Sequence, residues 1–197
     1  MSDPKQSFAR GLETIKALTG ISQADFDTLK EVAPQAKEWV DEIVQVFYDT
    51  LFAHERTASA FHEGERPLRE KSLTEWYYSL FEANDDAKFW TTQARIGFAH
   101  IRRHINNEYM IGMSNRVQEM FLNKSVEAFG LERGLAVAQA FNRIMDAVVG
   151  LTAEGYDVMS QIAFSEATGA DVALIDRLIQ ETVDDIQQRL LRSDTDT

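Results

Sequence analysis

Residues 76–112 read WYYSLFEANDDAKFWTTQARIGFAHIRRHINNEYMIG, and this stretch is the most informative about the fold of the chain. Its apolar residues follow helical spacing up to Phe81, the acidic ANDD breaks the pattern, and helical spacing then resumes. Gly97 lies one turn before His100 on the same helical face, beside Ile96, and leaves open space next to the imidazole. A flat, bulky group fits such space, and a neutral imidazole is a good iron ligand. On this chemistry alone, an ordinary core histidine is the alternative.

Outside this stretch the apolar residues also recur at spacings of three and four, and no alternating, strand-like run occurs. The three prolines are Pro4, Pro34 and Pro67, so residues 68–197 lack the strongest helix breaker. We expect Ser22 to cap a helix and Pro34 to lie in the first turn of the next one. The sequence therefore predicts an all-α fold, with helices over about residues 5–18, 22–33, 34–53, 67–82, 86–106, 108–129, 132–166 and 171–192.

The last two predicted helices have features that point beyond the core. The helix over 132–166 is far longer than an average helix, which indicates contact with something outside the core, such as a second subunit. The helix over 171–192 is amphipathic and needs a partner surface. We expect a domain over residues 1–168, ended by Gly169, and then a C-terminal helix with a frayed tail over 169–197.

The chain resembles the sensor-globin family, which comprises globin-coupled sensors, protoglobins and their single-domain relatives. The family has a Trp-x-x-x-Leu-Phe helix end, an acidic turn, an Arg-Ile-Gly-x-x-His motif and an aromatic residue in the next helix. Here these are Trp76, Leu80-Phe81, Asp85-Asp86, Arg95-Ile96-Gly97, His100 and Tyr109. The resemblance covers about residues 20–165. It implies a globin-like helical sandwich, to which this chain adds one N-terminal helix and one C-terminal amphipathic helix.

The resemblance also implies a cofactor and roles for particular residues. The cofactor is haem b, held non-covalently, with His100 as the proximal iron ligand. Phe47-Tyr48 matches a Phe-Tyr pair whose tyrosine hydrogen-bonds a bound gas, and Ser72 occupies the place of a second distal hydroxyl. Phe61 is the aromatic residue expected to stack on the haem.

The remaining haem contacts are expected to be apolar side chains that exclude water. The new residues of this kind are Leu51, Leu73, Met113 and Val117. We expect them to line the haem site together with Phe47, Trp76, Ile96, Gly97 and Tyr109, which are named above. The chain departs from the family at Asn106-Asn107, where a proline and a Trp-Tyr pair are common. His104, at i+4 from His100, is a second candidate ligand for a metal.

The composition excludes several classes of site and partner. The absence of cysteine excludes disulfides, cysteine-ligated zinc, iron–sulfur clusters, a catalytic thiol and covalent haem attachment. A net charge of −12 and a pI near 4.8 disfavour nucleic acid and anionic membrane surfaces as partners. No signal-peptide core and no apolar run near 18 residues is present, so we expect a cytoplasmic protein.

Together these patterns predict a haem-binding globin that reversibly binds O2, NO or CO for gas or redox sensing. The resemblance implies a homodimer through the last two globin helices and a downstream signalling partner. The GxSxG, GxxxxGK[ST], HExxH and GxGxxG motifs are absent, so we do not expect an enzyme. Three alternatives stay open: a haem-free interaction module, an NO dioxygenase and a peroxidase. A single-domain protein and a sensor module lacking its output domain are both compatible with a chain ending at residue 197.

Overall fold

The computed structural model describes the backbone of residues 4–193 and the side chains of residues 6–189, and throughout this range the chain is helical without strands. The all-α prediction is therefore confirmed for these residues. The tail predicted to be frayed lies outside the described residues from residue 194 onward. The helices are α1 (Pro4–Thr19), α2 (Gln23–Ala36), α3 (Val40–Phe52), α4 (Glu55–Ala58), α5 (Arg66–Leu80), α6 (Ala87–Arg102), α7 (Asn107–Phe129), α8 (Leu131–Thr168) and α9 (Val172–Ser193).

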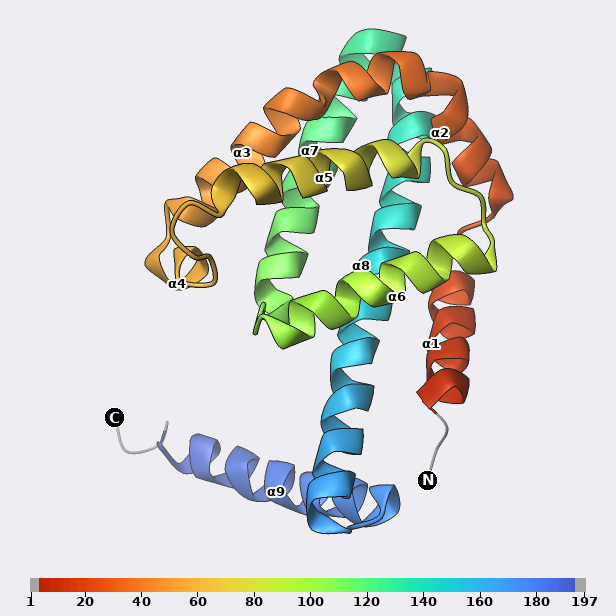
Figure 1. Ribbon diagram of the computed structural model, residues 1–197. Helices are drawn as coiled ribbons and strands as arrows, with labels where there is room; N and C mark the ends of the chain where they lie inside the picture. Colours follow the sequence, from red (N-terminus) through yellow and green to blue (C-terminus); the bar gives the residue numbers. More distant parts are fainter. Residues whose placement is uncertain (1–3, 194–197) are drawn as a thin grey trace.

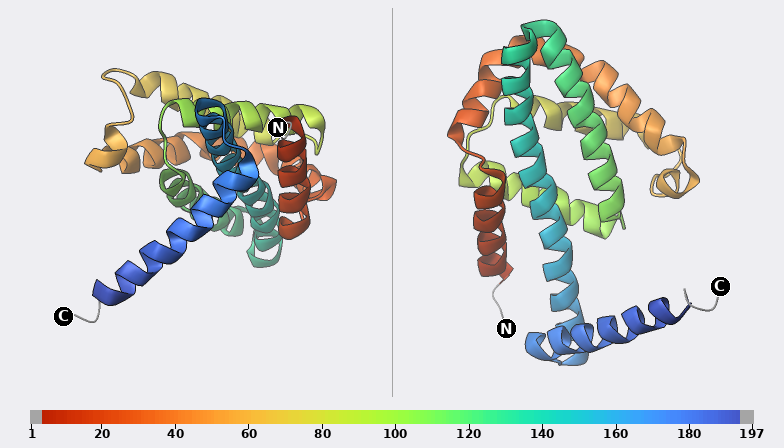
Figure 2. Two further views of the ribbon diagram at one scale, coloured as in Figure 1. Left: turned by 90° about the horizontal axis from the view of Figure 1, so that it is seen from below. Right: turned by 180° about the vertical axis from the view of Figure 1, so that it is seen from behind.

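The helices pack in layers around a central antiparallel pair, α7 and α8 (Figure 1). α5 and α6 lie across one face of this pair, and the view from behind in Figure 2 shows α7 and α8 in front of them. α1 runs beside α8, where Gly150 leaves room for the side chain of Ile15. The outer half of α8 projects from the body, and α9 crosses its far end (Figures 1 and 2).

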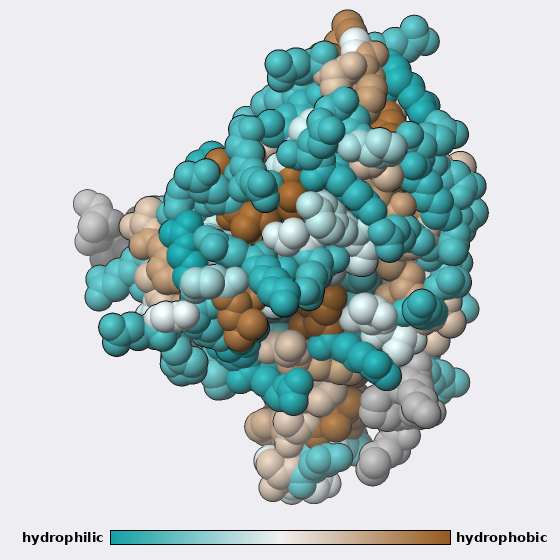
Figure 3. Space-filling view, turned by 45° about the horizontal axis from the view of Figure 1, so that its top comes forward, coloured by the Kyte–Doolittle hydropathy of each residue, from teal (hydrophilic) through white to brown (hydrophobic). Residues whose placement is uncertain are grey.

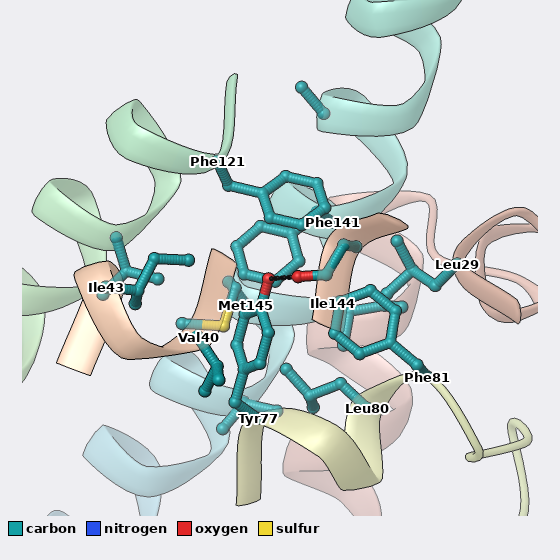
Figure 4. Packing of buried hydrophobic residues seen from close by; sticks show 14 of the residues in the cluster. Leu29, Val40, Ile43, Tyr77, Leu80, Phe81, Phe121, Phe141, Ile144 and Met145 are labelled. Atoms are coloured by element: carbon teal, nitrogen blue, oxygen red, sulfur yellow. Dashed lines mark hydrogen bonds between the residues drawn. The ribbon is translucent and has the colours of Figure 1, made fainter. Parts of the chain in front are cut away.

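Aromatic side chains from different helices form the centre of the core (Figure 4). Phe121 of α7 and Phe141 of α8 are fully buried and stacked, with ring centroids 3.8 Å apart. Tyr77 of α5 is also buried, and its hydroxyl donates a 2.9 Å hydrogen bond to the carbonyl of Ala36. This bond satisfies the only polar atom of the Tyr77 side chain, so a tyrosine is accommodated in an apolar core.

Capping side chains determine where two helices begin. Asp25 accepts a 2.8 Å hydrogen bond from the backbone N–H of Ser22, which is half of a capping box. The same buried carboxylate binds the guanidinium of Arg143 on α8, and so joins the start of α2 to the central pair. Asp86 caps α6 by accepting a 2.9 Å hydrogen bond from the Phe89 N–H.

Two sequence predictions about helix ends are wrong. Pro34 does not begin a helix: α2 continues through it to Ala36, and a 3-10 turn at Lys37–Trp39 then connects to α3. Proline has no backbone N–H, so near a helix end it removes only one hydrogen bond of the helix. The tighter 3-10 turn that follows connects α2 to α3. α6 ends at Arg102 rather than at residue 106, because His104 adopts a left-handed backbone conformation (φ 55°).

The outer part of the molecule exposes several large apolar side chains. Met159 and Phe164 on α8 and Ile179, Val183 and Ile186 on α9 are between 36% and 51% exposed. The space-filling view shows brown apolar atoms at its lower end as well as between the polar side chains of the body (Figure 3). None of the described helices is both long enough and apolar enough to span a membrane.

Candidate functional site

A cavity of about 360 Å³ lies between the helices of the body. Its size is within the range of small-molecule and cofactor sites, roughly 300–1,000 Å³. Residues of α3, α5, α6, α7, α8 and the α3–α5 connection line it, and most of them are apolar. The predicted site residues among them are Phe47, Tyr48, Leu51, Phe61, Ser72, Leu73, Trp76, Ile96, His100, Tyr109, Met113 and Val117.

His100 lies in the last turn of α6, on the cavity wall, and its imidazole Nδ1 is buried without a hydrogen-bond partner among the described residues. Burial lowers the pKa of the imidazole, and the nearby Arg103 lowers it further. The ring is therefore neutral at pH 7, which is the form that binds a metal. The backbone beyond it is fixed, because Ile105 N–H donates to the His100 carbonyl and the Tyr156 hydroxyl donates to the Ile105 carbonyl.

Tyr48, on α3, is a buried side chain on the cavity wall and is 6% exposed. The rings of Phe47 and Phe61 pack edge-on against it, with centroids 5.1 and 6.0 Å away. Burial raises its pKa to about 12, so the hydroxyl stays protonated at physiological pH. No side chain of the described residues hydrogen-bonds this hydroxyl, which is therefore a free donor beside the cavity.

The other polar residues predicted for the site have partners already. The Ser72 hydroxyl donates to the Leu68 carbonyl at 2.9 Å, so its proton is not free for a ligand. Trp76 Nε1 donates to the buried Gln93 amide oxygen at 3.0 Å, which fixes the indole against the cavity. The Tyr109 hydroxyl is 3.5 Å from the Arg56 carbonyl.

Gly97 and His104 lie away from the cavity. Gly97 packs against α8, where a Cβ atom added to it would lie 3.1 Å from Thr152 Cγ2. Its small size therefore serves the approach of α6 to α8. His104 is exposed and lies beyond the end of α6, so it does not share a helical face with His100. The structure thus separates the two histidines that sequence spacing placed together.

Sequence reasoning missed about half of the cavity wall. The residues it missed are Ile43, Thr57, Ala60, Arg69, Tyr77, Ala99, Ile105, Met110, Ser114, Met145, Val148, Val149 and Thr152. Arg103 also lines the wall, three residues after His100. Ala99 directly precedes His100 in the sequence, and that position alone could have marked it. Met145 and Val148 carry the helical spacing of a core face, and this pattern does not distinguish a cavity wall from a packed core.

Arg69 and Arg103 are the charged members of the cavity wall, and one carboxylate behind them binds both. Arg69 Nε donates to Glu65 Oε1 at 2.6 Å, and Arg103 Nη2 donates to Glu65 Oε2 at 2.7 Å. These bonds, together with the His62 N–H, hold the pKa of Glu65 at about 2. Glu65 is therefore ionised throughout the physiological range.

The arrangement of the helices defines the class of this protein, which has a globin fold. It aligns with the globin domain of a globin-coupled sensor from Geobacter sulfurreducens with a TM-score of 0.67 and 24% identity, covering 73% of this chain and 96% of that domain. The sequence profile of the protoglobin family matches residues 9–160, and the chain belongs to that family.

A curated relative carries no functional description. It is an uncharacterised protein of Methanocaldococcus jannaschii, 22% identical over 100 residues, which make up 49% of this chain and 53% of the relative. The chain therefore spans about half the length of the curated relative it matches. The family membership and the fold agree with the sensor-globin resemblance drawn from Arg95-Ile96-Gly97 and His100.

Proposed function

We propose that this protoglobin binds haem b non-covalently through His100 and reversibly binds a diatomic gas, O2, NO or CO, in gas or redox sensing. The observation that carries the proposal is a neutral, half-buried imidazole with a buried Nδ1 atom on the wall of a mostly apolar 360 Å³ cavity. Its Nδ1 atom has no hydrogen-bond partner among the described residues. Buried polar atoms normally have one, so the missing partner supports a bound group at this ring.

The residues present fit the cofactor. His100 would hold the iron, Phe61 and Trp76 would contact the macrocycle, and Leu51, Met113 and Val117 would exclude water. When bound, the haem iron supplies the open position at which a gas binds. Tyr48 donates a hydrogen bond toward a polar gas ligand, and the low local dielectric strengthens such a bond. Because Ser72 is bonded to its own helix, we assign the distal donor role to Tyr48 alone.

The absorption spectrum tests this proposal. We expect the reduced, haem-loaded protein to show a Soret band that shifts on addition of CO, and His100→Ala to lose or strongly alter that band. His104→Ala is the matched control, because this exposed histidine lies outside the cavity and its loss leaves the spectrum unchanged. If excess haem gives the wild type no specific Soret band, the gas-binding function is wrong and a haem-free interaction module replaces it.

We also propose that residues 1–168 form the sensing domain and that α8 and α9 join two copies into a homodimer, which would present a signal to a downstream protein. An isolated amphipathic helix is marginal in water, and the residues of α9 from 176 to 189 are all exposed. Ile175 is buried, and it ties the start of α9 to α8. The rest of the apolar face of α9 is free to pack against a second copy.

Sedimentation measurements test the dimer. We expect the wild type to sediment as a dimer of the 22.4 kDa chain and Ile179→Glu to shift it to monomer, because a carboxylate on the apolar face resists burial. Gln180→Glu adds the same charge at a neighbouring exposed residue and keeps the dimer. A monomeric wild type at tens of micromolar contradicts the proposal.

A further inference from the structure

The charged side chains that line the cavity are all cationic within the part of the chain that the structure describes. They are Arg69, from the first turns of α5, and Arg103, from the turn that follows α6. Glu65 binds both guanidinium groups, but it is not itself part of the cavity wall. An apolar cavity with two arginines and no acidic residue on its wall favours an anionic ligand group.

The neighbouring acids do not supply that anion. Asp49 and Glu70 lie nearby, but Arg66 binds both, at 2.6 Å in each case. Arg103 Nη2 donates to Glu65 and to the Ala60 carbonyl, whereas its Nε is buried without a partner among the described residues. An arginine carries five N–H donors in a planar fork, so both guanidinium groups retain donors for a further carboxylate.

The two arginines share the cavity wall with both polar groups assigned to the cofactor site. Arg103 follows His100 by three residues, just beyond the end of α6, and Arg69, His100 and Tyr48 line the same cavity. A ligand that fills this cavity would therefore meet the two arginines as well as His100 and Tyr48.

We propose that Arg69 and Arg103, held in place by Glu65, form a carboxylate-binding site that anchors the propionate groups of the porphyrin. This inference rests on the proposed function, because it assumes that the cavity takes a porphyrin. Arginine binds carboxylates through paired, charge-assisted hydrogen bonds, and the apolar surroundings strengthen them. The site fixes the rotation of the ring in the cavity independently of the bond between His100 and iron.

Binding of iron-free protoporphyrin IX and of its dimethyl ester tests the site, with tryptophan fluorescence as the readout. The two porphyrins differ only in their carboxylates, and neither carries iron. We expect the wild type to bind the diacid more tightly than the diester. We expect Arg103→Met and Arg69→Met each to weaken the diacid about tenfold and to leave the diester within about twofold, because only the diacid accepts charged hydrogen bonds.

Two controls keep the outcomes distinct. Arg102→Met removes an exposed arginine next to Arg103 that does not line the cavity, and it leaves both affinities unchanged. Unchanged diester binding by the Arg103 and Arg69 variants shows that they are folded. If either variant weakens both porphyrins equally, or neither, the carboxylate site is overturned. If diacid binding responds as expected but His100→Ala leaves the haem spectrum unaltered, the carboxylate site stands and the proposed iron ligand falls.

Discussion

Replacing Tyr48 by phenylalanine is expected to raise the O2 dissociation rate of the haem-loaded protein by about 10- to 100-fold, with less than about a threefold change for CO. Bound O2 carries partial negative charge and accepts a strong hydrogen bond, whereas bound CO is nearly apolar. The Tyr48 hydroxyl is buried and protonated, and it has no other partner among the described residues, so the whole bond is available to the ligand. Stopped-flow ligand replacement, starting from the O2 and the CO complexes, measures the two dissociation rates.

Ser72→Ala is the matched control for this prediction. It also removes a hydroxyl from the cavity wall, but that hydroxyl donates to the Leu68 carbonyl, so we expect the O2 rate to change by less than about threefold. Equal effects of the two substitutions, or an O2 rate that Tyr48→Phe leaves unchanged, contradict the role of Tyr48. A large rise in both gas rates would instead indicate a loosened cavity, because Tyr48 packs against Phe47 and Phe61.

Local spacing was enough to predict most of the helices. The period of three and four, the cap at Ser22 and the glycine at 169 correctly predicted where most helices lie, where α2 begins and where α8 ends. The error at Pro34 occurred because one local sequence signal is compatible with two structures. Proline is tolerated near either end of a helix, and nothing next to Pro34 distinguishes the two positions.

The cavity was predictable where a motif or an apolar helix face marked it. His100 and Tyr48 belong to short patterns that the resemblance identified, and both line the cavity. Arg69 is different, because it belongs to a polar helix and has the character of a surface residue in sequence. Its place on the wall depends on Glu65 and Arg103, which are 4 residues before and 34 residues after it in the chain. Helical spacing determines which side chains share a face, but not which distant faces meet.

Gly134 is the position at which we expect a single added methyl group to destabilise the fold most clearly. It lies near the start of α8, where the chain turns back along α7, and it is buried. A Cβ atom there would lie 2.5 Å from Val126 Cα and 2.6 Å from the Ser125 carbonyl oxygen. Both neighbours are backbone atoms, so no side chain can rotate away and the two helices must separate. We expect Gly134→Ala to lower the free energy of unfolding by about 3 kcal/mol, as measured by urea denaturation.

Gly112→Ala makes the same chemical change in α7 and is expected to have the opposite sign. No atom lies within 4 Å of a Cβ added at Gly112, and the residue is exposed in the middle of a helix. Alanine is favoured over glycine by about 0.8–1 kcal/mol at such a position, so this variant gains stability. Helix propensity favours alanine at residue 134 as well, so a net loss of stability there is smaller than the cost of the backbone contact and cannot come from propensity. If both variants gain stability, α7 and α8 are farther apart at residue 134 than the structure places them, and the close packing of the central pair is wrong.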